Sequence, residues 1–177
     1  VIGYDFARAA TMGRVMNEPR MVHWAFAWMA KVVNDGCFVD GMWHESASYH
    51  YMTMGGLRNA FAQVRGYSDP PGYVDEVDGR RFDGLDPEQA LPFYAKALKA
   101  PEVVGFPNGW SSPFHDTHPY ERRAPARDVT TSSILPGLGH ASLGRGTGPN
   151  QMQAQLHFSG GYGHTHADNL NLILWAQ

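Results

Sequence analysis

Apolar and polar residues divide the chain into a helical first part and a second part made of strands. Residues 21–33 are almost entirely apolar, which predicts a helix packed on more than one side and ended by the Asn-Asp-Gly triplet that follows. Apolar residues at helical spacing predict a second helix over about 48–64. Asp86 followed by Pro87 has the residue types of a helix N-terminus and predicts a third helix from there.

The second part of the chain has the two-residue period of strands. Residues 151–158 carry apolar side chains at every second position, which predicts a strand with one buried apolar face. Residues 169–175 repeat this pattern, and the glycine-rich segment 159–163 predicts the turn between them. Proline, glycine and polar residues dominate 106–130 and predict a long irregular connection. Helices followed by antiparallel strands are typical of an α+β chain.

Composition narrows the classes of partner. The chain has 177 residues, 43% of them hydrophobic, and a formal net charge of −3, so it has enough apolar residues to bury a core. Without a basic excess, a nucleic-acid partner held through its phosphates has little support. The single cysteine excludes an internal disulfide. Charged residues interrupt the first apolar run, so neither a signal peptide nor a membrane span is predicted there. A start at Val1 and an end within strand-like sequence lead us to expect a piece of a longer protein.

Residues 161–172 concentrate side chains that bind metals or transfer protons. His164, His166 and Asp168 alternate, so on an extended strand all three would point to one face. Imidazole and carboxylate suit zinc, and a zinc hydrolase built on this cluster is one open interpretation. Local hydrogen bonding at a strand entrance is another. The cluster also resembles the His-x-His-x-Asp-His motif of metallo-β-lactamases, but Asn169 replaces its last histidine and the apolar strand follows the motif instead of preceding it.

A second motif lies earlier in the chain. Its residues are Asp40, Gly41, Trp43, Glu45 and Tyr49. Together with Gly-His-Thr-His-Ala-Asp-Asn-Leu at 163–170, this pattern resembles the heparinase II/III-like polysaccharide lyases, including the alginate lyases of that superfamily. The segments 106–117 and 135–145 resemble two intermediate pieces of the same family, so the resemblance covers about residues 20–177 in order.

The resemblance implies an α+β multidomain fragment. Residues 1–105 would form the last helices of an incomplete α/α toroid, and 106–177 a linker and the first strands of an antiparallel β-sheet sandwich domain, with the active site between them. The implied activity is β-elimination on a uronic-acid-containing polysaccharide, an acidic polymer, by a periplasmic or extracellular bacterial enzyme. A carbohydrate-binding relative without catalysis stays an alternative.

The resemblance also assigns roles to individual residues. Tyr49 would shuttle protons, and His164 would assist acid–base chemistry or neutralise the substrate carboxylate, so the two should face each other despite their separation in sequence. Trp43, Glu45 and His50 are predicted to contact the substrate, although Glu45 also fits a local structural anchor.

A structural zinc ion is the implied cofactor. His166 is its predicted ligand, and the resemblance places the remaining ligands after Gln177. Asp168 is expected to hold a histidine ring by a hydrogen bond. Structural zinc prefers four protein ligands, so these residues alone are predicted to hold zinc weakly or not at all.

Overall fold

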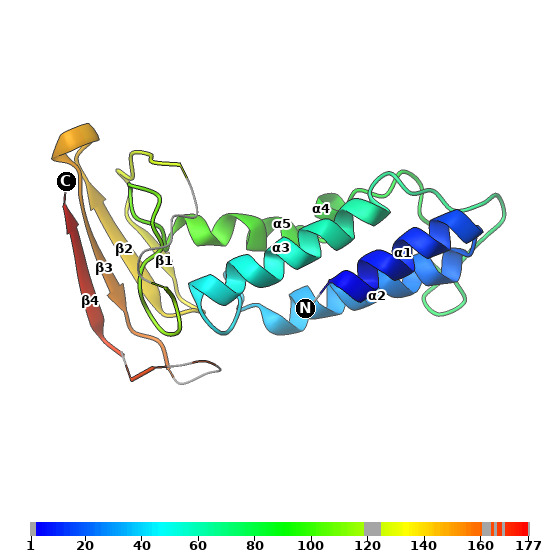
Figure 1. Cartoon of the computed structure of the whole chain (residues 1–177), viewed down its shortest axis with the longest axis horizontal. Helices are drawn as coiled ribbons and strands as arrows, with labels where there is room; N and C mark the ends of the chain where they lie inside the picture. The colour runs from blue at the N-terminus through cyan, green and yellow to red at the C-terminus, as the bar shows by residue number, and fades with distance from the viewer. Residues whose placement is uncertain (1–2, 119–124, 161–163, 165, 168, 177) are drawn as a thin grey trace. The chain divides into compact units, whose positions relative to one another are not determined.

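The computed structural model describes residues 3–118, 125–160, 164, 166–167 and 169–176 (Figure 1). Its helices are α1 (Tyr4–Met16), α2 (Pro19–Gly36), α3 (Ala47–Val64), α4 (Pro87–Ala90) and α5 (Pro92–Lys99), with short 3-10 helices at Ala100–Glu102 and Gly148–Asn150. Its strands are β1 (Ser133–Leu135), β2 (His140–Arg145), β3 (Met152–His157) and β4 (Asn171–Ala176). Helices therefore precede an antiparallel sheet, which confirms the α+β class. None of the described helices is long and apolar enough to cross a membrane.

The chain forms two compact units. The first contains Val1–Gly36 and Met52–Ala95, and the second contains Cys37–Tyr51 and Lys96–Gln177. The predicted domain boundary between residues 105 and 106 concerns a longer protein and stays a prediction. Within this chain, the loop before α3 and the first turn of that helix belong to the same unit as the sheet.

The core of the first unit lies between α2 and α3, and both helices confirm the predictions. α2 begins at Pro19, whose fixed φ suits the first helical turn, and buries one face along its length. The buried apolar residues of this face are Val22, Ala25, Phe26, Met29 and Val33. Phe26 packs edge-to-face on Phe61 of α3, with ring centroids 6.2 Å apart. Each buried aromatic or aliphatic side chain of this kind contributes about 1.5–3 kcal/mol through the area it removes from water.

Two elements of the first unit differ from the prediction. The third helix is divided in two, because Pro92 has no N–H to continue the helix and forces Leu91 out of the helical conformation (φ −130°, ψ 80°). Asp86 nevertheless caps α4 by accepting from the N–H of Glu88 at 3.0 Å, as predicted. α1 was not predicted, since only Ala10 and Gly13 of its residues are buried and the apolar pattern is weak.

The sheet has the simplest antiparallel order, β1-β2-β3-β4, with each strand hydrogen-bonded to the next in sequence (Figure 1). β1 and β2 form the strand pair implied for residues 135–145, and β3 confirms the predicted strand at 151–158. β4 begins at Asn171, so His164 and His166 do not belong to a strand.

β3 buries its polar face and exposes its apolar face, which is the reverse of the prediction. Gln153, Gln155 and His157 of β3 are at most 3% exposed. The exposed apolar residues, between 37% and 74% exposed, are Ile134, Leu143, Met152, Leu156, Leu172 and Leu174. The buried amides have polar partners: Gln153 donates to Ser142 Oγ at 2.6 Å, and Gln155 donates to Gln153 Oε1 at 3.0 Å. Alternation in sequence therefore locates the pleat but does not determine which face is covered.

Candidate active site

The loop before α3 is held by a buried carboxylate. Asp40 accepts from the N–H of Met42 at 3.3 Å and, with its other oxygen, from the N–H of Leu138 at 2.9 Å, in the turn between β1 and β2. Gly41 has φ +93°, and a Cβ there would lie 3.0 Å from the backbone nitrogen of Ala97. The predicted Asp-Gly turn is therefore present, and glycine is required at its second position.

Ser46 places Tyr49 in the first turn of α3. Its backbone oxygen accepts the first helical hydrogen bond, from the N–H of His50 at 2.9 Å, and its Oγ accepts from the N–H of Tyr49 at 3.4 Å, as a helix cap does. The same Oγ donates to the backbone oxygen of Asp116 at 3.0 Å. The start of α3 and the segment around Asp116 are thus joined through one hydroxyl.

Trp43 and His50, both predicted to contact the substrate, are enclosed by protein. His50 is 1% exposed, and its Nδ1 accepts from the N–H of Trp43 at 2.9 Å. Burial lowers the pKa of His50 to about 4, with a partial offset from a hydrogen bond to the backbone of Ala97, so the ring is neutral at pH 7. Trp43 is 6% exposed, and its Nε1 donates to Glu45 Oε2 at 2.8 Å. This arrangement fits support of the loop and orientation of Glu45 better than direct contact with a substrate.

The two predicted catalytic residues lie against each other. The rings of Tyr49 and His164 are stacked, with centroids 4.3 Å apart and an interplanar angle of 28°. His164 has φ +53°, within a turn, and its side chain is 47% exposed. The two residues were expected to lie across a cleft from each other; the structure brings them together in direct ring contact, and their chemical roles stay predictions.

Two carboxylates flank this ring pair. His164 Nε2 lies 3.8 Å from Glu45 Oε1, and His164 Nδ1 lies 3.5 Å from Asp116 Oδ2. A hydrogen bond with Asp116 is the largest effect that raises the pKa of Tyr49, followed by burial and by the negative charges of Asp116 and Glu45. The phenol is therefore protonated at neutral pH.

Asp116 was not among the predicted site residues. It lies in the 106–117 segment that resembles the lyase family, and this position is the signal for it in the sequence.

A buried histidine pair anchors the segment that carries Asp116. His115 Nε2 lies 2.8 Å from His157 Nε2 at the end of β3, and Ser159 Oγ lies 2.9 Å from the first and 2.7 Å from the second. All three side chains are at most 6% exposed, and Phe114 stacks on His157 with ring centroids 4.3 Å apart. The neighbouring His140 is fully buried, and burial is the main cause that lowers its pKa to about 3.

The prediction that His164, His166 and Asp168 share one face of a strand is wrong for the described residues. His164 has left-handed backbone dihedrals, and β4 begins only at Asn171. His166 has an exposed side chain, and its backbone N–H approaches His115 Nδ1 at 3.4 Å. Asp168 lies outside the described residues. Within the described part of the chain, His166 belongs to no group of three potential metal ligands, and the zinc site stays a prediction.

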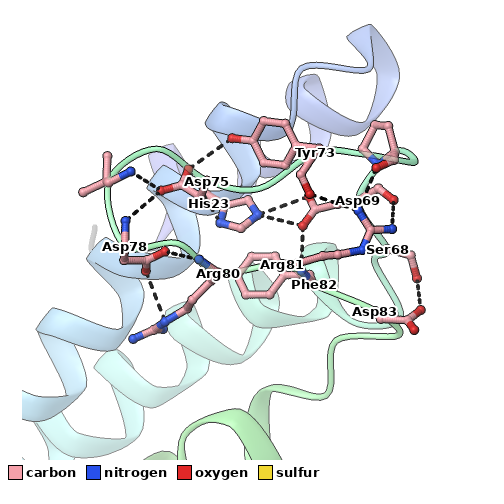
Figure 2. Close-up of polar contacts among 12 residues, drawn as sticks. His23, Ser68, Asp69, Tyr73, Asp75, Asp78, Arg80, Arg81, Phe82 and Asp83 are labelled. Atoms are coloured by element: carbon pink, nitrogen blue, oxygen red, sulfur yellow. Dashed lines mark hydrogen bonds and ion pairs between the residues drawn. The ribbon is translucent and has the colours of Figure 1, made fainter.

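Another histidine–carboxylate cluster lies in the first unit (Figure 2). His23 Nε2 lies 3.0 and 3.1 Å from the two oxygens of Asp69, and its Nδ1 lies 3.7 Å from Asp75 Oδ2. His23, Asp75 and Asp78 have potential ligand atoms within 4.8 Å of one another. The aspartates, however, already accept from protein donors: Asp69 from Phe82 N–H, Asp75 from the Tyr73 hydroxyl and Val77 N–H, and Asp78 from Arg80. We therefore interpret the cluster as a hydrogen-bonded network that fastens the 67–85 loop to α2.

Comparison with known proteins shows a relationship in fold. No family model matches the chain, and no curated protein matches it. Among solved structures, it is similar to a heparinase III gene product with methylated lysines, with a TM-score of 0.68 and 16% sequence identity. The alignment covers 90% of this chain and 27% of that one, so this chain spans about a quarter of the other's length. At this identity, the similarity establishes the fold alone.

Proposed function

We propose that this chain carries part of the active site of a polysaccharide lyase that cleaves a uronic-acid-containing polymer by β-elimination. The observation that carries the proposal is the stacking of Tyr49 on His164, which brings two acid–base side chains together from distant segments. The fold relationship with a heparinase III supports it. By the same relationship, α1 to α5 would be the last helices of an incomplete α/α toroid.

The reaction defines what the site must supply. A base removes the proton on C5 of the uronate, next to its carboxylate. The electron pair of that C–H bond forms a C4–C5 double bond, the bond from C4 to the glycosidic oxygen breaks, and this oxygen takes up a proton from an acid. Because the C5 proton is weakly acidic, the site must also stabilise the negative charge that develops on the carboxylate.

The protonation of Tyr49 favours a particular division of labour. Its hydrogen bond with Asp116 keeps the phenol protonated, so in its resting form Tyr49 suits the delivery of a proton to the departing oxygen. His164, stacked on it and exposed, would take the C5 proton. Because the carboxylates of Glu45 and Asp116 both lie beside His164, a uronate needs a positively charged or hydrogen-bond-donating group to approach this site.

The zinc-hydrolase alternative has less support. It requires a ring nitrogen of His164 to bind metal, whereas both nitrogens face carboxylates and the ring is stacked on Tyr49. We propose instead that His166 contributes to a structural zinc site, with its other ligands elsewhere in the protein.

Product absorbance tests the proposal. The full-length protein, incubated with alginate, glycosaminoglycans or other uronans, should release products with the near-ultraviolet absorbance of a conjugated double bond. Tyr49→Phe removes only the hydroxyl and should lower turnover by a factor on the order of 100 or more. Tyr51→Phe, two residues further along α3, is the matched control and should keep turnover. Products without the double bond would show hydrolysis and refute the lyase assignment.

A further inference from the structure

Asp116 makes more contacts with the site than any predicted role requires. Its carboxylate lies 3.5 Å from His164 Nδ1, whose ring is stacked on Tyr49, and hydrogen bonding with this carboxylate is the main cause that raises the pKa of Tyr49. Its backbone oxygen accepts from Ser46 Oγ at 3.0 Å. One residue therefore contacts both predicted catalytic side chains and the cap of the helix that carries one of them.

The backbone around Asp116 is fixed on both sides. Before it, the His115 ring is packed in the buried contact with His157 and Ser159. After it, the N–H of His118 donates to Ser48 Oγ at 3.2 Å, in the first turn of α3. The segment is thus attached to the end of β3 and to the start of α3, which leaves Asp116 little freedom to move away from Tyr49.

We propose that Asp116 is a positioning residue, whose carboxylate holds the Tyr49 hydroxyl and the His164 ring in one arrangement and retains the phenol proton until the leaving oxygen takes it. This proposal rests on the proposed lyase function. In this step the proton leaves Tyr49 for the sugar oxygen, and the phenolate that results is reprotonated from solvent. The C5 proton, taken up by His164, returns to solvent.

The second carboxylate provides a comparison within the same site. Glu45 is held by the indole N–H of Trp43, lies 3.8 Å from His164, and acts on Tyr49 through its charge and not through a hydrogen bond. Glu45→Gln and Asp116→Asn each remove one negative charge near Tyr49, but only the second weakens the hydrogen bond to its hydroxyl. Any difference between the two variants therefore reports on that contact.

The first measurement needs no substrate. The ionisation of Tyr49 is followed by titrating the ultraviolet absorbance of tyrosinate in the wild type and subtracting the curve of Tyr49→Phe. Circular dichroism identifies the pH values at which every variant is folded, and the comparison is limited to these values. In Asp116→Asn the same difference titration should show Tyr49 ionising at lower pH than in the wild type, with a smaller change in Glu45→Gln. An unchanged titration in Asp116→Asn would overturn the proposal, whatever the activity of the protein.

The second measurement separates this proposal from the proposed function. In the full-length lyase, Asp116→Asn should lower kcat about 10- to 100-fold and change KM only a few-fold. Added to Tyr49→Phe, it should lower kcat by a smaller factor than in the wild type, because part of its effect acts through the lost hydroxyl. Equal factors in both backgrounds would overturn the positioning role. Full turnover in Tyr49→Phe itself would instead refute the catalytic assignment of Tyr49, while the titration would still decide the Asp116 contact.

Discussion

Each unit contains a histidine that lies between two carboxylates: His23 in the first unit and His164 in the second. The two histidines differ in burial. His23 is 5% exposed, with Asp69 at 3.0 Å and Asp75 at 3.7 Å from its ring nitrogens. His164 is 47% exposed, with Asp116 at 3.5 Å and Glu45 at 3.8 Å. The side chains are of the same types, so residue identity does not distinguish the two clusters.

Their surroundings do distinguish them. Around His23, the hydrogen bonds from backbone N–H groups and from Tyr73 leave the aspartates satisfied without solvent. Such a cluster stabilises a loop, and removing one partner leaves buried charge uncompensated. Around His164 the contacts are longer and reached by water, so the ring can exchange protons and a ligand can compete for its partners. Burial therefore separates a structural histidine from a catalytic candidate.

The largest expected effect concerns stability. His23→Ala should lower the free energy of unfolding by about 3–5 kcal/mol, because two buried aspartates lose their partner. His164→Ala should change it by less than about 0.5 kcal/mol, as exposed substitutions usually do. Urea unfolding of both variants measures the difference. Similar losses would mean that the two clusters have the same structural role, and the comparison would fail.

The two tyrosines sharpen the contrast, since each donates to an aspartate. Tyr73→Phe removes the hydroxyl that Asp75 accepts from at 3.1 Å and should cost about 1 kcal/mol of stability without changing turnover. Tyr49→Phe should have the opposite profile, with unchanged unfolding and turnover reduced on the order of 100-fold in the full-length protein. Urea midpoints and product absorbance, measured on both variants, give the two profiles. A loss of turnover in Tyr73→Phe with normal stability would contradict the assignment.

Acid should weaken the buried cluster. Burial raises the pKa of Asp75, but hydrogen bonds from Val77 and Tyr73 and the proximity of His23 outweigh it, so the pKa lies below its usual value. The stability contributed by Asp75 is therefore complete above its unfolded pKa of about 3.9 and lost as pH falls through the lower folded value. Asp75→Asn should be less stable at pH 7 and lose less on acidification, as followed by urea midpoints. Asp35→Asn, on the exposed surface of α2, is the control, and the expectation fails if both variants keep the acid sensitivity of the wild type.

Local patterns predicted the elements better than their environments. The helices at 21–33 and 48–64 and the strand at 151–158 follow from periodicity because a helix or strand repeats within a few residues. The covered face of β3 does not follow from its pattern, because it depends on a distant segment: the buried Gln155 amide donates to the backbone oxygen of Gly105 at 3.5 Å. A polar face that supplies hydrogen bonds to an irregular segment looks like a solvent face in the sequence.

The candidate site shows the same limit. Tyr49 and His164 were paired through resemblance to a family and not through any local pattern, since they are distant in the chain. The place of Asp116 depends on how the 115–118 segment meets α3, which sequence alone does not give. The resemblance predicted that Tyr49 and His164 belong to one site, while the contacts that support them required coordinates.

Salt should produce the smallest effect and should act on one cluster only. The screening length falls from about 10 Å at 0.1 M to about 3 Å at 1 M ionic strength, so a charge pair in contact with water loses most of its attraction over this range. His164→Gln should therefore lower the free energy of unfolding by a few tenths of a kcal/mol at about 0.1 M sodium chloride, and by nothing measurable at about 1 M. His23→Gln should show nearly the same large loss at both concentrations, since water does not separate His23 from Asp69. Paired urea titrations of wild type and variant at each salt concentration cancel the general effect of salt on folding. If the loss in His23→Gln disappeared in salt, the His23 cluster would be open to solvent, and burial would no longer explain why the two histidines differ.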